Sequence, residues 1–285
     1  MKKIGALIIL LVSFLIMLAQ PFCYGQLIGE DVLALTSNGD HSLVKNVTLF
    51  ELLSVRPYVI GNMLNIKASD GREAKVYEVK SGTGLGNVIL LFHDGLGLNE
   101  NVQREAEQLH SETGFTVLAL DFFEGITSNN MDDANKLMDA VNKEHARAII
   151  QSAIDYAGKN GKIQTIGWGF GGSWSLQAAL MAGSKNRGCV LFYGMPESDP
   201  AKIKELEGPV LGFFAKQDKL ITAEVVKEFS KLMNENGKEI TVLSYDADHD
   251  FANVNNVNYK KDLADEAHKK AVEFIKKNAA VPFNK

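Results

Sequence analysis

Three places in this sequence carry residues that could perform chemistry, and each comes directly after an apolar run. The first is the glycine-rich stretch IGWGFGGSWS, which spans residues 166–175. The second is Asp218 and the third is His249, which follow two later apolar runs in that order. A carboxylate that orients an imidazole allows the imidazole to take a proton from an attacking group. The order of these residues therefore predicts acid–base chemistry in which Asp218 supports His249.

The glycine-rich stretch permits two interpretations, and one of them is a nucleotide-binding loop. Gly167, Gly169 and Gly172 form the pattern in which loop N–H groups and a helix N-terminus hold a pyrophosphate. Such a loop is followed about 20 residues later by an acidic residue that binds a ribose. Glu197 meets this requirement only loosely, and Trp168 is large for a loop that must let a phosphate approach. A dinucleotide-binding domain is therefore the third of our functional hypotheses.

The other interpretation is a nucleophile elbow, the sharp strand-to-helix turn that exposes a catalytic side chain. Elbows carry glycines on both sides of the nucleophile because the turn is strained and the helix packs closely on the strand. Gly167 and the pair Gly171-Gly172 meet this requirement, and an acid and then a His follow in the required order. Gly169 stands at the position of the nucleophile, and it has no side chain.

The elements that must position these residues are predicted by hydrophobic patterning. Six short apolar runs are strand candidates: NVILLF, FTVLAL, KIQTIG, GCVLFY, PVLGFFA and EITVLS. Between and after them lie helical patterns at Glu105–Thr113, Lys143–Gly158, Ala223–Asn236 and Lys260–Lys277. The alternation predicts an α/β fold with a mostly parallel, doubly wound sheet covered by helices on both faces. Before it, Asn62–Ala68 and Ala74–Lys80 flank Ser69-Asp70-Gly71 and predict an N-terminal antiparallel hairpin.

The first 25 residues have the pattern of a secretory signal. Lys2 and Lys3 precede an apolar run and small residues, and the run is short for a membrane span. We expect export to the periplasm or the exterior, with an uncleaved membrane anchor as the alternative. Residues 26–57 form an N-terminal extension of unassigned role, and residues 58–280 form one domain. Cleavage would remove two lysines and no acid, which changes the net charge from −5 to −7 and argues against nucleic acid as a partner.

From residue 62 to residue 277 the sequence closely resembles the dienelactone hydrolase family of α/β-hydrolases. The resemblance is carried by FHDGLGLN, ALDFFEG, GWGFGG, GCVLFYGMP, LGFFAKQD and YDADHDFAN, which begin at residues 92, 119, 167, 188, 211 and 245. Members of this family hydrolyse lactone or ester bonds with a Cys, an Asp and a His. The resemblance implies an α/β-hydrolase fold and a reaction that needs neither a metal nor an organic cofactor.

The resemblance also implies a role for each matching residue. Asp218 and His249 are the expected acid and base, and Asp94 takes the place of a family Glu near the nucleophile. The backbone N–H groups of Phe170 and Gly95 are the expected oxyanion hole. Gly169 takes the place of the Cys, which is the main departure from the family pattern. A further departure is Asp250, which follows the His where a small apolar residue is common.

The missing nucleophile leaves three possible sources of the attacking atom. Ser173 lies one helical turn beyond the elbow and is a good helix cap. Cys189 begins a buried strand and is expected to be an inert core thiol. Water is the third source, because the volume of a Cys side chain is close to that of one water molecule, and His249 could act as its general base.

Hydrolysis of a small-molecule ester or lactone is therefore the leading hypothesis. Without a nucleophile at Gly169, we expect this hydrolysis to be slow and water-mediated, or the activity to be lost. A non-catalytic module that binds a small ester, lactone or carboxylate is the alternative. We expect no metal and take a monomer as the default.

Overall fold

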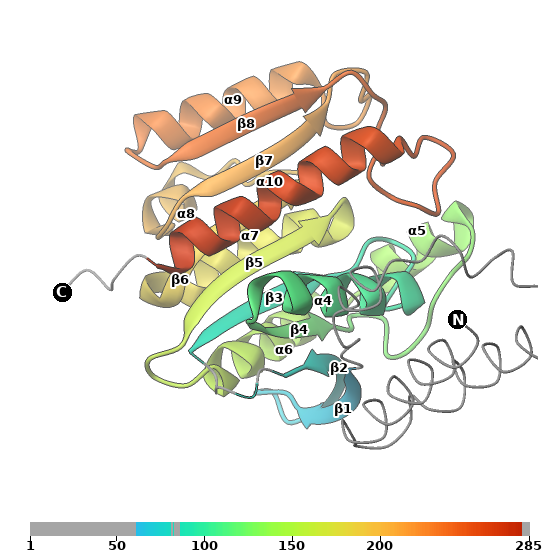
Figure 1. Ribbon diagram of the computed structural model, residues 1–285, viewed down its shortest axis with the longest axis vertical. Helices are drawn as coiled ribbons and strands as arrows, with labels where there is room; N and C mark the ends of the chain where they lie inside the picture. Colours follow the sequence, from blue (N-terminus) through green and yellow to red (C-terminus); the bar gives the residue numbers. More distant parts are fainter. Residues whose placement is uncertain (1–60, 81, 83–85, 281–285) are drawn as a thin grey trace, which may run out of the picture. The chain divides into compact units, whose positions relative to one another are not determined.

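The computed structural model describes residues 61–80, 82 and 86–280. Eight strands in this part of the chain form one sheet in the order β1-β2-β4-β3-β5-β6-β7-β8 (Figure 1). The strands are β1 (Asn62–Lys67), β2 (Glu73–Val79), β3 (Asn87–Phe92), β4 (Thr116–Leu120), β5 (Lys162–Trp168), β6 (Asn186–Phe192), β7 (Val210–Ala215) and β8 (Ile240–Tyr245). Strands β3 to β8 are mutually parallel, whereas β2 is antiparallel to both of its neighbours, β1 and β4.

Helices cover both faces of this sheet, as a parallel sheet requires. They are α4 (Glu100–Thr113), α5 (Met131–Ala140), α6 (Lys143–Tyr156), α7 (Phe170–Ala182), α8 (Pro200–Glu205), α9 (Ala223–Glu235) and α10 (Lys261–Ala279), with a 3-10 turn, η2, at Gly183–Lys185. Alternate residues of each central strand face opposite layers. Leu91 of β3 packs in the cluster that contains α4 and α10, whereas Leu90 packs in the cluster that contains α6 and α7. Helices α8 and α9 cover the second face beyond α7.

The predicted α/β-hydrolase architecture is confirmed in its main features. All six predicted parallel strands are present within two residues of their expected bounds, and the N-terminal hairpin forms with its turn at Ser69-Asp70-Gly71. Helix α4 begins at Glu100, five residues before the predicted start, because the side chain of Asn99 accepts hydrogen bonds from the first N–H groups. Helices α5 and α8 were not predicted.

The predicted signal at residues 1–25 and the extension at residues 26–57 lie outside the described residues. Within the described part of the chain, no helix is both long and apolar enough to span a membrane.

Candidate active site

The parallel strands end in register, and this brings the predicted residues to one edge of the sheet. Phe92 at the end of β3 pairs with Gly167 of β5, and Ala215 at the end of β7 pairs with Tyr245 at the end of β8. The segments that leave these ends carry four predicted site residues: Asp94, Gly169, Asp218 and His249.

Gly169 forms the elbow between β5 and α7. It is the single residue between the two elements, and its backbone has φ 53° and ψ −113°, a conformation that residues with a side chain rarely adopt. The helix packs so closely on the sheet that a Cβ at Gly171 would lie 2.2 Å from the carbonyl oxygen of Phe92. The structure therefore supports the elbow. Since Gly167 lies inside β5 and Gly172 inside α7, no loop remains between them to surround a pyrophosphate.

His249 and Asp218 form the predicted pair. Nδ1 of His249 lies 2.6 Å from Oδ2 of Asp218, whose side chain is fully buried. The other oxygen of Asp218 accepts hydrogen bonds from the backbone N–H groups of Leu220 and Ile221, at 2.8 and 2.9 Å. With Nδ1–H donated to Asp218, Nε2 is the atom available for chemistry.

The imidazole faces the empty position of the nucleophile. A Cβ built on Gly169 would lie 3.9 Å from Nε2 of His249 and 3.9 Å from Oδ1 of Asp250, and apart from the two flanking residues no other described atom lies within 4 Å. A nucleophile at this position would project from that point into hydrogen-bonding range of the imidazole. The structure therefore brings together the base, the acid and the elbow, and leaves the space of a side chain between them.

Asp94 is linked to the loop that carries His249 and is held at both carboxyl oxygens. Oδ1 accepts a hydrogen bond from the N–H of Leu96 at 2.8 Å, and Oδ2 accepts one from Nδ2 of Asn253 at 2.7 Å. Burial raises the pKa of the Asp94 carboxyl. The preceding residue, His93, is buried, and its Nε2 accepts a hydrogen bond from the N–H of Phe122 at 3.1 Å. His93 therefore builds the loop that carries Asp94.

The two predicted oxyanion donors belong to adjacent segments. Phe170 is the first residue of α7, and no side chain caps that helix at Gly169. Gly95 follows the end of β3, and Gly171 packs directly against the backbone of Phe92 and His93 at that strand end. The uncapped N–H groups at the start of a helix are favourable sites for negative charge. The arrangement is compatible with stabilisation of an oxyanion by Phe170 and Gly95.

Asp250 belongs to the site, although the sequence analysis noted it only as a departure from the family pattern. Its Oδ1 lies 3.7 Å from Nε2 of His249, on the side away from Asp218. Its backbone has φ 64°, a left-handed conformation that is uncommon for residues other than glycine. Nδ2 of Asn256 donates a hydrogen bond to Oδ2 at 2.9 Å, and burial raises the pKa of the Asp250 carboxyl. A positive φ at one Asp has no clear sequence signal, so this contact could not be predicted.

Neither Ser173 nor Cys189 takes the place of the missing nucleophile. Oγ of Ser173 lies 3.5 Å from the carbonyl oxygen of Gly169, within the first turn of α7. Cys189 is fully buried in β6, and burial raises the pKa of its thiol to about 11. A protonated, inaccessible thiol is a poor nucleophile, so Cys189 is a core residue, as expected.

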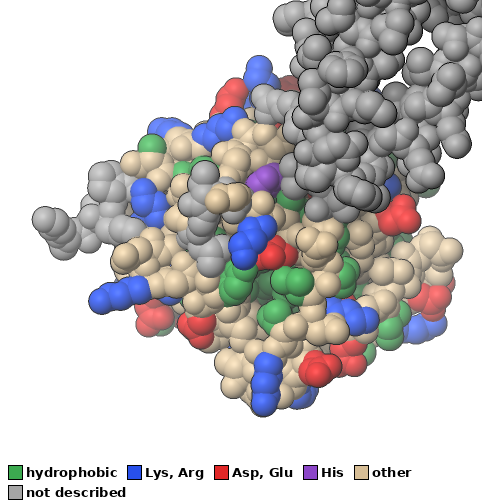
Figure 2. Space-filling model, turned by 60° about the horizontal axis from the view of Figure 1, so that its bottom comes forward, with side chains coloured by type: hydrophobic (Ala, Val, Ile, Leu, Met, Phe, Trp, Pro, Cys, Tyr) green, Lys and Arg blue, Asp and Glu red, His purple; other side chains and the backbone are tan. Residues whose placement is uncertain are grey.

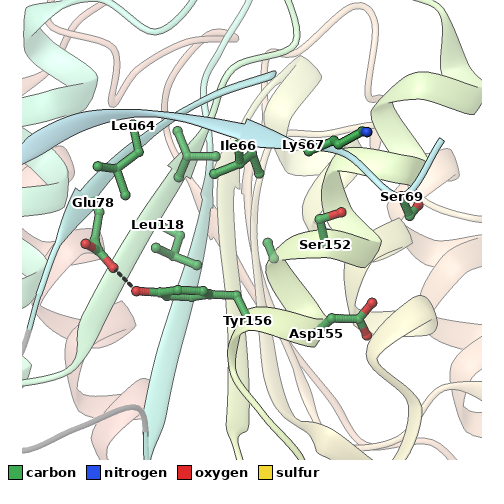
Figure 3. A pocket seen from close by; sticks show the side chains of 11 residues that line it. Leu64, Ile66, Lys67, Ser69, Glu78, Leu118, Ser152, Asp155 and Tyr156 are labelled. Carbon is green, nitrogen blue, oxygen red and sulfur yellow. Dashed lines mark hydrogen bonds between the residues drawn. The ribbon is translucent and has the colours of Figure 1, made fainter. Parts of the chain in front are cut away.

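A cavity lies away from these residues. It has a volume of about 380 Å³ and lies between the β1–β2 hairpin, β4 and α6 (Figure 3). Aliphatic side chains line much of it, and at one side the hydroxyl of Tyr156 donates a hydrogen bond of 2.5 Å to Glu78. Figure 2 views the molecule from the side of the hairpin, where apolar side chains gather among acidic and basic ones. The described lining residues include neither His nor Cys, so this cavity differs in its groups from the pair of His249 and Asp218.

In the described residues, no group of three or more His, Cys, Asp or Glu side chains could hold a metal ion.

Comparisons with known proteins show which sequences and folds this chain resembles. The chain is 26% identical over 204 residues to the "Putative carboxymethylenebutenolidase" of Aquifex aeolicus, covering 67% of this chain and 88% of that protein.

Two solved structures share the fold. One is a dienelactone hydrolase-like promiscuous phosphotriesterase from metagenomic libraries, with a TM-score of 0.65 at 18% identity, covering 77% of this chain and 99% of that one. The other is an esterase of Pyrococcus furiosus, with a TM-score of 0.57 at 18% identity, covering 82% of this chain and 97% of that one. The sequence model described as "Dienelactone hydrolase family" matches residues 74–279. This chain is a member of the dienelactone hydrolase family of α/β-hydrolases.

Proposed function

We propose that this protein hydrolyses ester or lactone bonds of small molecules, with water in place of a side-chain nucleophile. The observation that carries the proposal is the space at Gly169. The position of a Cβ there lies 3.9 Å from Nε2 of His249, whose Nδ1 is held by Asp218. A water molecule in that space would lie within reach of an oriented general base.

The expected reaction is direct addition of water to the carbonyl carbon. Nε2 of His249 takes one proton from the water as its oxygen attacks, and Asp218 stabilises the imidazolium that forms. The backbone N–H groups of Phe170 and Gly95 would receive the negative charge of the tetrahedral intermediate. Collapse of the intermediate, with return of the proton to the leaving oxygen, releases an acid and an alcohol, or one hydroxy acid from a lactone.

The absence of a covalent step sets the expected rate. In a Ser-His-Asp protease, removal of the nucleophile costs on the order of 10⁶ in turnover and leaves roughly 10³–10⁴ over the uncatalysed reaction. We therefore expect slow turnover that shows no acyl-enzyme burst.

The test is hydrolysis of p-nitrophenyl acetate and of dihydrocoumarin by the natural chain and by His249→Ala. The proposal expects slow turnover that the substitution abolishes. The matched control is His110→Ala, because His110 lies in the last turn of α4, just before β4 begins and thus at the opposite edge of the sheet. Turnover that is equal in the natural chain and in the His249 variant would contradict the proposal.

The alternative function is binding without turnover, and the same observation favours it, since Gly169 cannot form an acyl-enzyme. A folded natural chain that binds a small ester or its carboxylate product, but releases it unchanged, would establish this alternative. Isothermal titration with the substrate and with its carboxylate product would distinguish the two functions.

A further inference from the structure

We propose that Asp250 is a catalytic residue that holds the attacking water together with His249. The inference rests on the proposed function and adds a second protein ligand for the water. The residue that follows the catalytic His would thereby compensate in part for the side chain that Gly169 lacks.

The distances at the elbow define a site for one water molecule. Oδ1 of Asp250 and Nε2 of His249 are 3.7 Å apart, so one oxygen atom can lie at about 2.8 Å from both. Both atoms also lie 3.9 Å from the position of a Cβ on Gly169. The positions at about 2.8 Å from both acceptors form a ring, and the part of this ring on the side of Gly169 lies in the space of the missing side chain, where the attacking atom of the family nucleophile would project.

The two acceptors orient the water for attack. Nε2 is an acceptor because Nδ1 donates to Asp218, and a carboxylate oxygen is an acceptor when it is ionised. A water that donates one hydrogen to Nε2 and the other to Oδ1 directs a lone pair away from both, towards the substrate. Without Asp250, the second hydrogen of the water would be free to rotate, and the lone pair would lose its fixed direction.

The proton balance of the step is complete with these groups. The water oxygen forms a bond to the carbonyl carbon while one of its protons moves to Nε2, which gives an imidazolium between two carboxylates. When the intermediate collapses, the bond to the leaving oxygen breaks and that oxygen takes the proton from Nε2. Asp250 keeps its negative charge throughout the reaction. Because the imidazole is positively charged only during attack and in the intermediate, the attraction to Asp250 stabilises these states relative to the ground state.

The surroundings of Asp250 hold its carboxylate in this orientation. Its side chain is 13% exposed, and Asn256 binds Oδ2 and leaves Oδ1 on the side of His249. Nδ2 of Asn258 donates a hydrogen bond at 2.9 Å to the carbonyl oxygen of His249, which fixes the backbone between the two residues. The left-handed backbone at Asp250 is thus supported by the loop that follows it.

The same carboxylate would have the opposite effect if it paired with the protonated imidazole and blocked Nε2. The two effects differ in sign, and the comparison of two backgrounds separates them. In the natural Gly169 background, we expect Asp250→Ala to lower kcat about 10²-fold, with KM little changed. The kcat of Asp250→Asn should lie between those of the natural chain and the Ala variant, because its amide oxygen can still accept a hydrogen bond from the water. In a Gly169→Cys background, we expect Asp250→Ala to raise thiol-dependent turnover about tenfold, because a carboxylate beside a thiol disfavours the thiolate by about one pKa unit.

The experiment is hydrolysis of p-nitrophenyl acetate by these variants, with Asp248→Asn as the matched control, because Asp248 is an exposed Asp of the same loop. Circular dichroism shows whether each variant is folded. An increase of turnover on Asp250→Ala in the natural background would overturn this inference and leave the proposed function intact. No turnover by the natural chain, with an active Gly169→Cys variant, would overturn both.

A labelling experiment tests whether Asp250 holds the water or attacks by itself. A single turnover in H₂¹⁸O should place the label in the acid product and leave the peptide that contains Asp250 unlabelled by mass spectrometry. Label in the carboxylate of Asp250 would mean that this residue is the nucleophile, and would overturn the assignment.

Discussion

The substitution Gly169→Cys should restore the nucleophile of the family at a measurable cost in stability. Residue 169 has φ 53° and ψ −113°, which a residue with a Cβ adopts at a cost of roughly 1–3 kcal/mol. Crowding adds little, because the two nearest atoms to a Cβ lie at 3.9 Å, an ordinary contact distance. A loss of about 1–3 kcal/mol should lower Tm by roughly 2–12 °C in a domain of this size.

The matched control is Gly183→Cys. Gly183 has φ 50° and ψ −129°, nearly the same backbone, and a Cβ there would meet no atom of the described residues within 4 Å. The two variants should therefore lose similar stability in thermal unfolding, while only the Gly169 variant gains a thiol next to His249. We expect that variant alone to show a burst of p-nitrophenol from p-nitrophenyl acetate, and iodoacetamide to abolish it. A folded Gly169→Cys protein without a burst would refute the geometry that we assign to the elbow.

Three further predictions concern the packing and the ion pairs of the fold. Gly171→Ala should destabilise the protein by about 3 kcal/mol, since its Cβ would lie 2.2 Å from a backbone oxygen. Gly82→Ala, with no described atom within 4 Å of its Cβ, should be nearly neutral in urea unfolding. Burial alone would lower the pKa of His268, but contacts with two glutamates raise it to about 9. The contribution of these ion pairs to the free energy of unfolding is therefore complete below pH 6.5 and is lost as pH rises through 9. Glu112→Gln should therefore lower the free energy of unfolding by about 1 kcal/mol at pH 6 and by much less at pH 10; an equal loss at both pH values would contradict this reasoning. Cys189 should resist iodoacetamide in the folded protein and react only in denaturant, because its thiol is buried.

The strands and the acid–base pair could be predicted from the sequence because their signals are local. A fully buried strand such as β3 is one continuous apolar run, and the residues after such strands lie at one edge of the sheet. Helix α8 also had a local signal that was overlooked, since Asp199 caps it and Pro200 opens it. The position of Asp250 had no such signal, because it depends on a positive φ and on Asn256, six residues further along.

One loop after β8 carries both His249 and Asp250, and asparagine side chains hold it in place. Asn253 binds Asp94 across the site, and Asn258 binds the carbonyl oxygen of His249. A hydrogen bond from an amide contributes about 1 kcal/mol to a neutral acceptor and about 1.5–3 kcal/mol to a carboxylate. We therefore predict that this loop, although it buries Phe251, opens before the sheet unfolds. Fluctuation of this one segment would remove the base and its neighbouring carboxylate together. Inactivation by mild urea should then precede the loss of helical structure, and amide hydrogen exchange should be faster in this loop than in β7.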